Sequence, residues 1–164
     1  MLRLPLVLSI AVVTSAGLFA AEPAKEAYKP AAAPSQDELN KKLAADLTNV
    51  KLVGRFTVTG KESDTPKEEE YTITSALKLP EPDLWLLKAR IKYGKTDQTF
   101  PIPLEIKWAG DTPIITLTNL EIPGLGTFTS RVVIYEGRYA GTWQHGNVGG
   151  HLFGRIEKLP AEDK

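Results

Sequence analysis

Apolar and polar residues alternate along most of the chain after Lys51, with the period of two that half-buried β-strands show. The stretch Trp85–Tyr93 is the clearest: its odd-numbered residues are apolar, and Lys88, Arg90 and Lys92 lie between them. An antiparallel strand with one buried and one wet face has this pattern. The alternation and the intervening turn residues predict strands over Leu52–Thr59, Tyr71–Leu79, Trp85–Tyr93, Phe100–Trp108, Ile114–Leu120 and Thr127–Tyr135, before a hairpin over Arg138–Ile156.

The number and spacing of these strands predict an all-β fold. About eight strands follow one another through short or moderate loops with no helical pattern between them, so parallel crossovers are not available. We therefore expect an antiparallel up-and-down barrel, with a β-sandwich as the alternative. Because proline has no N–H for the ladder, Pro101 and Pro103 predict an edge, a bulge or a late start to pairing in the fourth strand.

The final hairpin and Gly137 just before it hold six of the 13 glycines, which suit tight turns and close backbone approaches. A loop over Gly146–Gly150 would place Trp143 opposite Phe153. A register shifted by one residue would instead lay the Trp143 ring over Gly154. In either register we expect the hairpin to close a curved sheet.

A short helix is predicted ahead of the strands. Ser35 and Glu38 have the spacing of a capping box. Leucines then recur at helical spacing at positions 39, 43 and 47. These signals predict an amphipathic helix over Gln36–Leu47, and its leucine stripe should pack against the sheet.

The N-terminal sequence has the features of a secretory signal. A basic start precedes an apolar run over Leu4–Phe19 and the small residues Ala20 and Ala21. An uncleaved anchor is the alternative, but the run falls short of the 18 or more apolar residues of a spanning helix. We expect a signal peptide at 1–20, a disordered linker at 21–34, one β domain with its N-terminal helix at 35–159 and a polar tail at 160–164. Such a protein would be periplasmic or secreted.

Composition removes several classes of function. The chain has no cysteine, which excludes disulfides, thiol catalysis, thiolate metal sites and a lipid-anchored lipoprotein. Its formal net charge is +0, and basic and acidic residues are interspersed. We therefore expect neither nucleic acid nor anionic lipid as a partner, and no stable membrane insertion after signal cleavage.

No catalytic site is predicted from the sequence. There is no G-x-S-x-G elbow, phosphate loop or dinucleotide fingerprint, so neither an enzyme activity nor a cofactor is expected. The acidic run Glu68–Glu70 is placed in a mobile polar loop over Gly60–Glu70, as a solvated run of charge. Carboxylates that cleave glycosides would need rigid strands instead.

The two histidines are candidate metal ligands. His145 and His151 both lie in the final hairpin, which could bring them to one face as two ligands for zinc or copper. A third ligand would have to be a carboxylate such as Glu136 or Glu157. The alternative is a pair of loop histidines without metal.

Aromatic residues on the apolar strand faces are candidates for ligand binding. An eight-stranded barrel has either a filled interior or room for one small molecule. The aromatic residues would line such a cavity or simply fill the core. They are Trp85, Tyr93, Phe100, Trp108 and Trp143.

Two segments carry a resemblance to known proteins. The segment Leu52-Val53-Gly54-Arg55-Phe56 resembles the opening of lipocalin and other calycin barrels, although those have tryptophan where this chain has Phe56. In that family an arginine packs on the aromatic ring, a role that the resemblance would give to Arg155. The hairpin over 141–154 more closely resembles small exported bacterial proteins of no known activity.

Together these features favour an exported, non-enzymatic β-barrel that binds an apolar or amphipathic small molecule. A structural or adhesive module of the cell envelope, with a protein or glycan partner, is the alternative from another class. Metal binding through the two histidines is the third.

Overall fold

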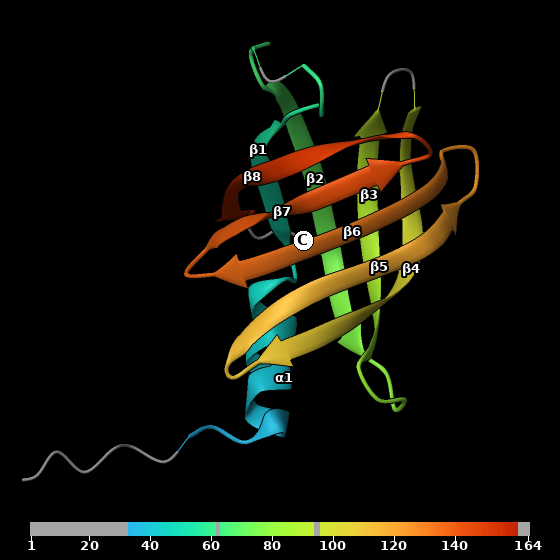
Figure 1. Ribbon diagram of the computed structural model, residues 1–164. Coiled ribbons are helices and arrows are strands. Elements are labelled where there is room, and N and C mark those ends of the chain that lie inside the picture. The colour runs from blue at the N-terminus through green and yellow to red at the C-terminus, as the bar shows by residue number, and fades with distance from the viewer. Residues whose placement is uncertain (1–32, 62, 94–95, 161–164) are drawn as a thin grey trace, which may run out of the picture. The chain divides into compact units, whose positions relative to one another are not determined.

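The predicted strands form in the computed structural model, and the last of them pairs with the first (Figure 1). The structure describes residues 33–61, 63–93 and 96–160. Each strand is antiparallel to its neighbours, so the up-and-down barrel is confirmed in place of the sandwich. The elements are α1 (Gln36–Asp46), β1 (Val50–Phe56), β2 (Lys67–Lys78), β3 (Leu84–Tyr93), β4 (Thr96–Ala109), β5 (Thr112–Ile122), β6 (Gly126–Tyr135), β7 (Arg138–His145) and β8 (Val148–Lys158).

The expected signal peptide at 1–20 lies outside the described residues. So do most of the expected linker at 21–34 and the tail beyond Pro160.

Helix α1 lies at one end of the barrel (Figure 1). The capping box forms as predicted: the Glu38 carboxylate accepts from the Ser35 backbone N–H at 2.8 Å, and the Ser35 hydroxyl accepts from the Glu38 N–H. Leu43 and Leu47 are buried in the barrel core. The Lys158 ammonium of β8 donates to backbone carbonyls at the end of the helix. Helix α1 therefore closes this end of the barrel.

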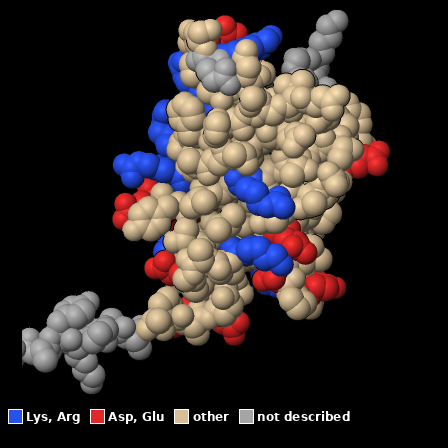
Figure 2. All heavy atoms as spheres, viewed as in Figure 1, with Lys and Arg blue, Asp and Glu red and all other residues tan. Residues whose placement is uncertain are grey.

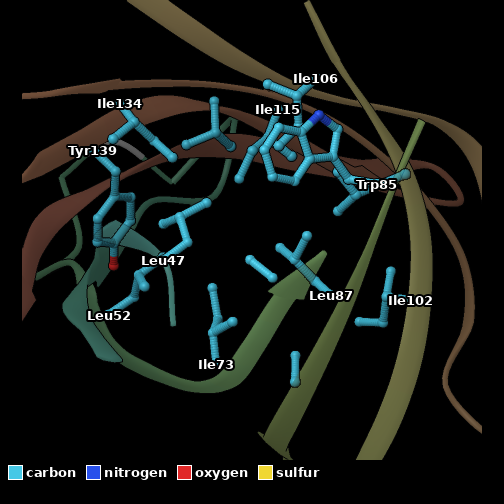
Figure 3. Packing of buried hydrophobic residues seen from close by; sticks show 14 of the residues in the cluster. Leu47, Leu52, Ile73, Trp85, Leu87, Ile102, Ile106, Ile115, Ile134 and Tyr139 are labelled. Atoms are coloured by element: carbon cyan, nitrogen blue, oxygen red, sulfur yellow. The ribbon is translucent and has the colours of Figure 1, made fainter. Parts of the chain in front are cut away.

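The largest fully buried side chains of the described residues lie at the end of the barrel next to α1. They are Leu47, just after the helix, Val50 at the start of β1, Trp85 near the start of β3 and Ile106 toward the end of β4. Leu47, Trp85 and Ile106 are seen in Figure 3. The inward side chains of β3 and β4 alternate as the sequence predicts. The Trp85 indole Nε1 is buried without a hydrogen-bond partner among the described residues. The opposite end of the barrel has no helix over it within the described chain.

Strand β2 begins earlier than predicted. It starts at Lys67, so Glu68–Glu70 belong to a strand and not to the expected mobile loop. Each residue of this run pairs with β1, and Glu69 lies opposite Gly54. Because side chains alternate between the two faces of a strand, Glu69 and its neighbours point to opposite sides of the barrel wall. The expectation of a uniformly solvated run of charge is therefore wrong for Glu69.

The final hairpin also differs from both predicted registers. A two-residue turn, Gly146-Asn147, joins β7 to β8, and Trp143 pairs with Gly150. Gly146 has a φ of 57°, and a glycine with positive φ is favoured at the first position of such turns. The short turn moves the pairing three residues from the register expected for a loop over Gly146–Gly150. The Trp143 ring does cover a glycine, as one predicted register proposed, but this glycine is Gly150 and not Gly154.

The pairing of strand β4 with its neighbours explains how it accommodates two prolines. The strand pairs with β3 over Thr96–Glu105, whereas its pairs with β5 begin at Glu105. Pro101 and Pro103 precede that point and have a partner strand on one side only. Of the three predicted alternatives, a late start to pairing is the observed one.

Candidate functional site

A cavity of about 260 Å³ lies inside the barrel, toward the end away from α1. Side chains from all eight strands line it, as expected when inward positions of a small barrel leave part of the interior unfilled. Most of the wall is apolar. Its main members are Leu52, Phe56, Ile73, Ala89, Ile91, Ile102, Leu104, Ile115, Leu117, Ile122, Phe128, Val132, Trp143 and Leu152.

Trp143 lies at the end of this cavity that is away from α1. Its ring contacts Phe56 edge to face, with centroids 5.5 Å apart, and its indole N–H donates to the Thr57 carbonyl at 3.1 Å. A Cβ at Gly150 would collide with that carbonyl, so glycine is required there. Thr57 is in turn hydrogen-bonded to His151 in both directions through backbone and hydroxyl groups. Trp143 thus joins β7 to the chain that follows β1.

A second hollow of about 410 Å³ leads outward from this end. It shares Phe56, Glu69, Tyr71, Phe128 and Trp143 with the cavity. Its other members include Lys61, Lys67 and His145. We call this hollow the mouth of the cavity.

A polar cluster interrupts the apolar wall, which Glu68, Glu70, Thr129 and Ser130 also border. The Glu69 carboxyl group accepts a hydrogen bond from the Tyr139 hydroxyl at 2.8 Å on one oxygen and from the Tyr71 hydroxyl at 3.1 Å on the other. All three residues line the cavity. Tyr139 is only 3% exposed, and its ring lies within the cluster of buried side chains (Figure 3). A carboxyl group is therefore fixed by two phenols inside the barrel.

Two glycines make this cluster possible. Glu69, Gly54, Gly154 and Tyr139 occupy one row across β2, β1, β8 and β7, each paired with the next. A Cβ at Gly54 would collide with the Tyr139 hydroxyl, and one at Gly154 would lie 2.7 Å from the Tyr139 ring. The Tyr139 side chain on β7 thus passes over Gly154 on β8 and Gly54 on β1, and it reaches the Glu69 carboxylate on β2. Any side chain at either glycine would block it.

Burial changes the ionisation of all three groups. Loss of water raises the pKa of Glu69, while the hydrogen bonds from Tyr139 and Tyr71 act in the opposite direction. The pKa values of Tyr71 and Tyr139 are raised, first by burial and then by the adjacent carboxylate. Both phenols therefore keep their protons and remain hydrogen-bond donors to Glu69 at neutral pH.

The neighbouring carboxylates behave differently. Glu68 forms an ion pair with Arg55 at 3.4 Å, and Glu70 forms one with Lys51 at 3.1 Å. These pairs belong to the outer face of the barrel, where acidic and basic side chains are interspersed on the side shown in Figure 2. Among the described residues, no Lys, Arg or His forms an ion pair with Glu69.

The structure does not gather the five predicted aromatic ligand residues at one site. Trp143 lines the cavity, whereas Trp85 is fully buried in the closed end. Phe100 is half-buried against the core on β4 and is not part of the cavity wall. Trp108 lines a separate open groove of about 540 Å³ beside α1. The side chain of Tyr93 lies outside the described part of the structure.

The two predicted metal ligands are not brought together. Trp143 pairs with Gly150, so His145 shares the inner face of the hairpin with Trp143, whereas His151 is on the outer face. The His145 ring stacks on Phe128, with centroids 4.4 Å apart, and His151 is exposed. Within 33–61, 63–93 and 96–160, no group of three or more histidine or acidic residues has the arrangement of a metal site.

Sequence reasoning missed Glu69, Tyr71 and Tyr139. A signal was present, because Glu69, Tyr71 and Ile73 continue the period of the second strand toward its start. Because Glu68 and Glu70 flank Glu69, the pattern instead indicated a charged, solvated loop at the start of this strand.

No protein-family model, curated protein or solved structure matches this chain. In the described part of the chain, no helix has the length and apolarity needed to cross a bilayer.

Proposed function

We propose that this protein is a non-enzymatic barrel that binds a small, largely apolar molecule in its interior cavity. The observation that carries the proposal is the cavity itself, with its wall of aliphatic and aromatic side chains. Sites for small molecules typically have such a wall with a few fixed polar groups. Glu69, Tyr71 and Tyr139 supply those groups.

The cavity volume limits the size of the ligand. At about 260 Å³ it lies just below the ~300 Å³ at which pockets for drug-sized molecules begin. A molecule with one aromatic ring or a short aliphatic chain suits this space. The mouth, with Phe128 and Trp143 in its wall, is the route by which it would enter.

The proposal places the protein outside the cytoplasm, in the periplasm or secreted. The support is the sequence of residues 1–20, with its basic start, apolar run and small residues before the expected cut. Cell fractionation of the full chain, with N-terminal sequencing of the product, tests this part separately.

A pair of matched variants tests the interior site. Ala89 lines the cavity, so Ala89→Leu should fill part of it. Ala140 is exposed on the outer face, so Ala140→Leu adds the same atoms elsewhere. Propylbenzene should quench or shift the tryptophan fluorescence of the full chain saturably, and Ala89→Leu should weaken this binding about tenfold or more, the scale of a clash of ~1.4 kcal/mol. Ala140→Leu should bind as the parent does. Equal binding by both variants would contradict an interior site.

A second candidate function is a structural or adhesive module of the envelope. The observation in its favour is an apolar row on the outer face, in which Val133, Ala140 and Phe153 are paired with one another across β6, β7 and β8. Val133 is 41% exposed and Phe153 44%. This reading predicts that Phe153→Ser abolishes retention of the protein on isolated envelope material, and unchanged retention would contradict it.

A further inference from the structure

We propose that Glu69, Tyr71 and Tyr139 make the cavity selective for molecules that join an apolar body to a protonated amine. This inference rests on the proposed function and names the class of ligand. It follows from three features of the cluster: its hydrogen-bonding capacity, its charge and its construction.

The cluster can accept hydrogen bonds but has none left to donate. Each phenol has one O–H, and both already donate to the Glu69 carboxylate. An ionised carboxylate only accepts, and its two oxygens have room for about four bonds, of which two are used here. The indole N–H of Trp143 is also occupied, by the Thr57 carbonyl. A ligand that donates fits this group of acceptors, whereas a carboxylate ligand finds no donor in it.

The charge of the cluster also lacks a partner. Glu68 and Glu70 on the same strand each form an ion pair, but no described Lys, Arg or His does so with Glu69. An ionised carboxylate in an apolar surrounding is costly unless it is paired. The two phenols offset part of this cost. An ammonium group, with three donors and a positive charge, would offset the rest.

The cluster is positioned by the backbone around it. Gly54 and Gly154 leave the space through which the nearly buried Tyr139 reaches Glu69. Aromatic rings of Phe56, Phe128 and Trp143 line the same cavity, and aromatic faces attract cations. Lys61 and Lys67 belong to the mouth and not to the wall of the inner cavity. Of the three carboxylates that border the inner cavity, Glu69 is the one that points inward, because Glu68 and Glu70 form ion pairs on the outer face.

Three probes of similar size test this selectivity: 2-phenylethylamine, 3-phenylpropanoate and propylbenzene. Each is titrated against the full chain at neutral pH by calorimetry. The amine should bind at least about tenfold more tightly than the carboxylate, since a hydrogen bond to a charged group is gained in one case and a like charge is met in the other. Equal or reversed affinities would overturn the inference.

Matched variants assign the selectivity to Glu69. Glu69→Gln should weaken binding of the amine about tenfold or more and change that of propylbenzene less than twofold. Glu105→Gln removes an exposed carboxylate of β4 that does not line the cavity, and it should leave both affinities unchanged. Tyr139→Phe keeps the carboxylate, so it should keep the preference for the amine. Loss of the preference in a folded Tyr139→Phe, or its survival in Glu69→Gln, would contradict the assignment.

The same titrations separate the two proposals. If propylbenzene binds but the amine is not preferred, the cavity binds ligands and only the inference fails. If none of the three probes binds, the proposed function fails and the inference fails with it. Circular dichroism of each variant establishes that a loss of binding is not a loss of the fold.

Discussion

At the scale of the residue, Glu69 differs from its two neighbours on β2 in its surroundings. It lies on the inward face of β2 with two phenols as hydrogen-bond donors, whereas Glu68 and Glu70 have basic partners. Burial raises its pKa, so the folded state holds the Glu69 proton more strongly than the unfolded chain does. This difference links the stability of the barrel to pH.

The sign of that linkage gives a test. In the unfolded chain Glu69 ionises near its ordinary value of 4.5, while in the folded state ionisation requires a higher pH. Between these two values the folded state binds more protons, so the contribution of Glu69 to the free energy of unfolding falls as pH rises. The phenols do not titrate there because their pKa values are raised. We expect Glu69→Gln to gain stability relative to the parent as pH rises from about 4 to 8.

Urea unfolding of the parent and Glu69→Gln at several pH values measures this difference. Comparing the two proteins cancels the titration of groups that they share. If Glu69→Gln instead loses stability relative to the parent as pH rises, Glu69 is not desolvated in the folded protein.

At the scale of the element, Trp143 attaches the β7–β8 hairpin to the end of β1 that is away from α1. The ring contacts Phe56, covers Gly150 and donates to the Thr57 carbonyl, so three segments meet at one side chain. Trp143→Ala would lose these contacts and leave a void. A cost of about 3 kcal/mol is expected, the low end for a large aromatic because the ring is only partly buried.

Thermal and urea unfolding of Trp143→Ala, with His151→Ala as the control, check this prediction. His151 is on the outer face of the same hairpin and is exposed, so its side chain should contribute little. Equal stability of the two variants would show that the hairpin does not depend on Trp143.

The elements differ in how far the sequence predicts them. Strand β3 is unambiguous, because its apolar residues alternate with lysine and arginine and only one face can be buried. The register between β7 and β8 is ambiguous in the sequence, because glycines at 141, 146, 149, 150 and 154 leave few side chains to distinguish the inner face from the outer one. The turn at Gly146 sets that register instead. The start of strand β2 is not predicted, because three consecutive glutamates there are typical of a loop.

The candidate site was still harder to foresee. It depends on Gly54 and Gly154 being adjacent on paired strands, so that Tyr139 reaches a residue 70 positions away in the chain. A periodic pattern along one strand contains no information about such a row across four strands. The sequence therefore predicts the aromatic core and misses the polar cluster within it.

At the scale of the whole barrel, one end is closed and the other leads to a cavity. Helix α1, Trp85 and Ile106 fill the closed end, while the inward residues of the far half leave about 260 Å³ unfilled. The account places the ligand there. Two other surfaces could take an apolar molecule instead: the groove beside α1, which includes Leu39, and the outer row around Phe153.

Intermolecular nuclear Overhauser effects from bound propylbenzene decide among the three places. The probe is added to the full chain with methyl-labelled leucine, isoleucine and valine. The account predicts contacts from the probe to Leu52, Ile102 and Leu152, whose side chains line the cavity. Contacts confined to Leu39 or to Val133 would place the ligand in the groove beside α1 or on the outer face, and would contradict the interior site.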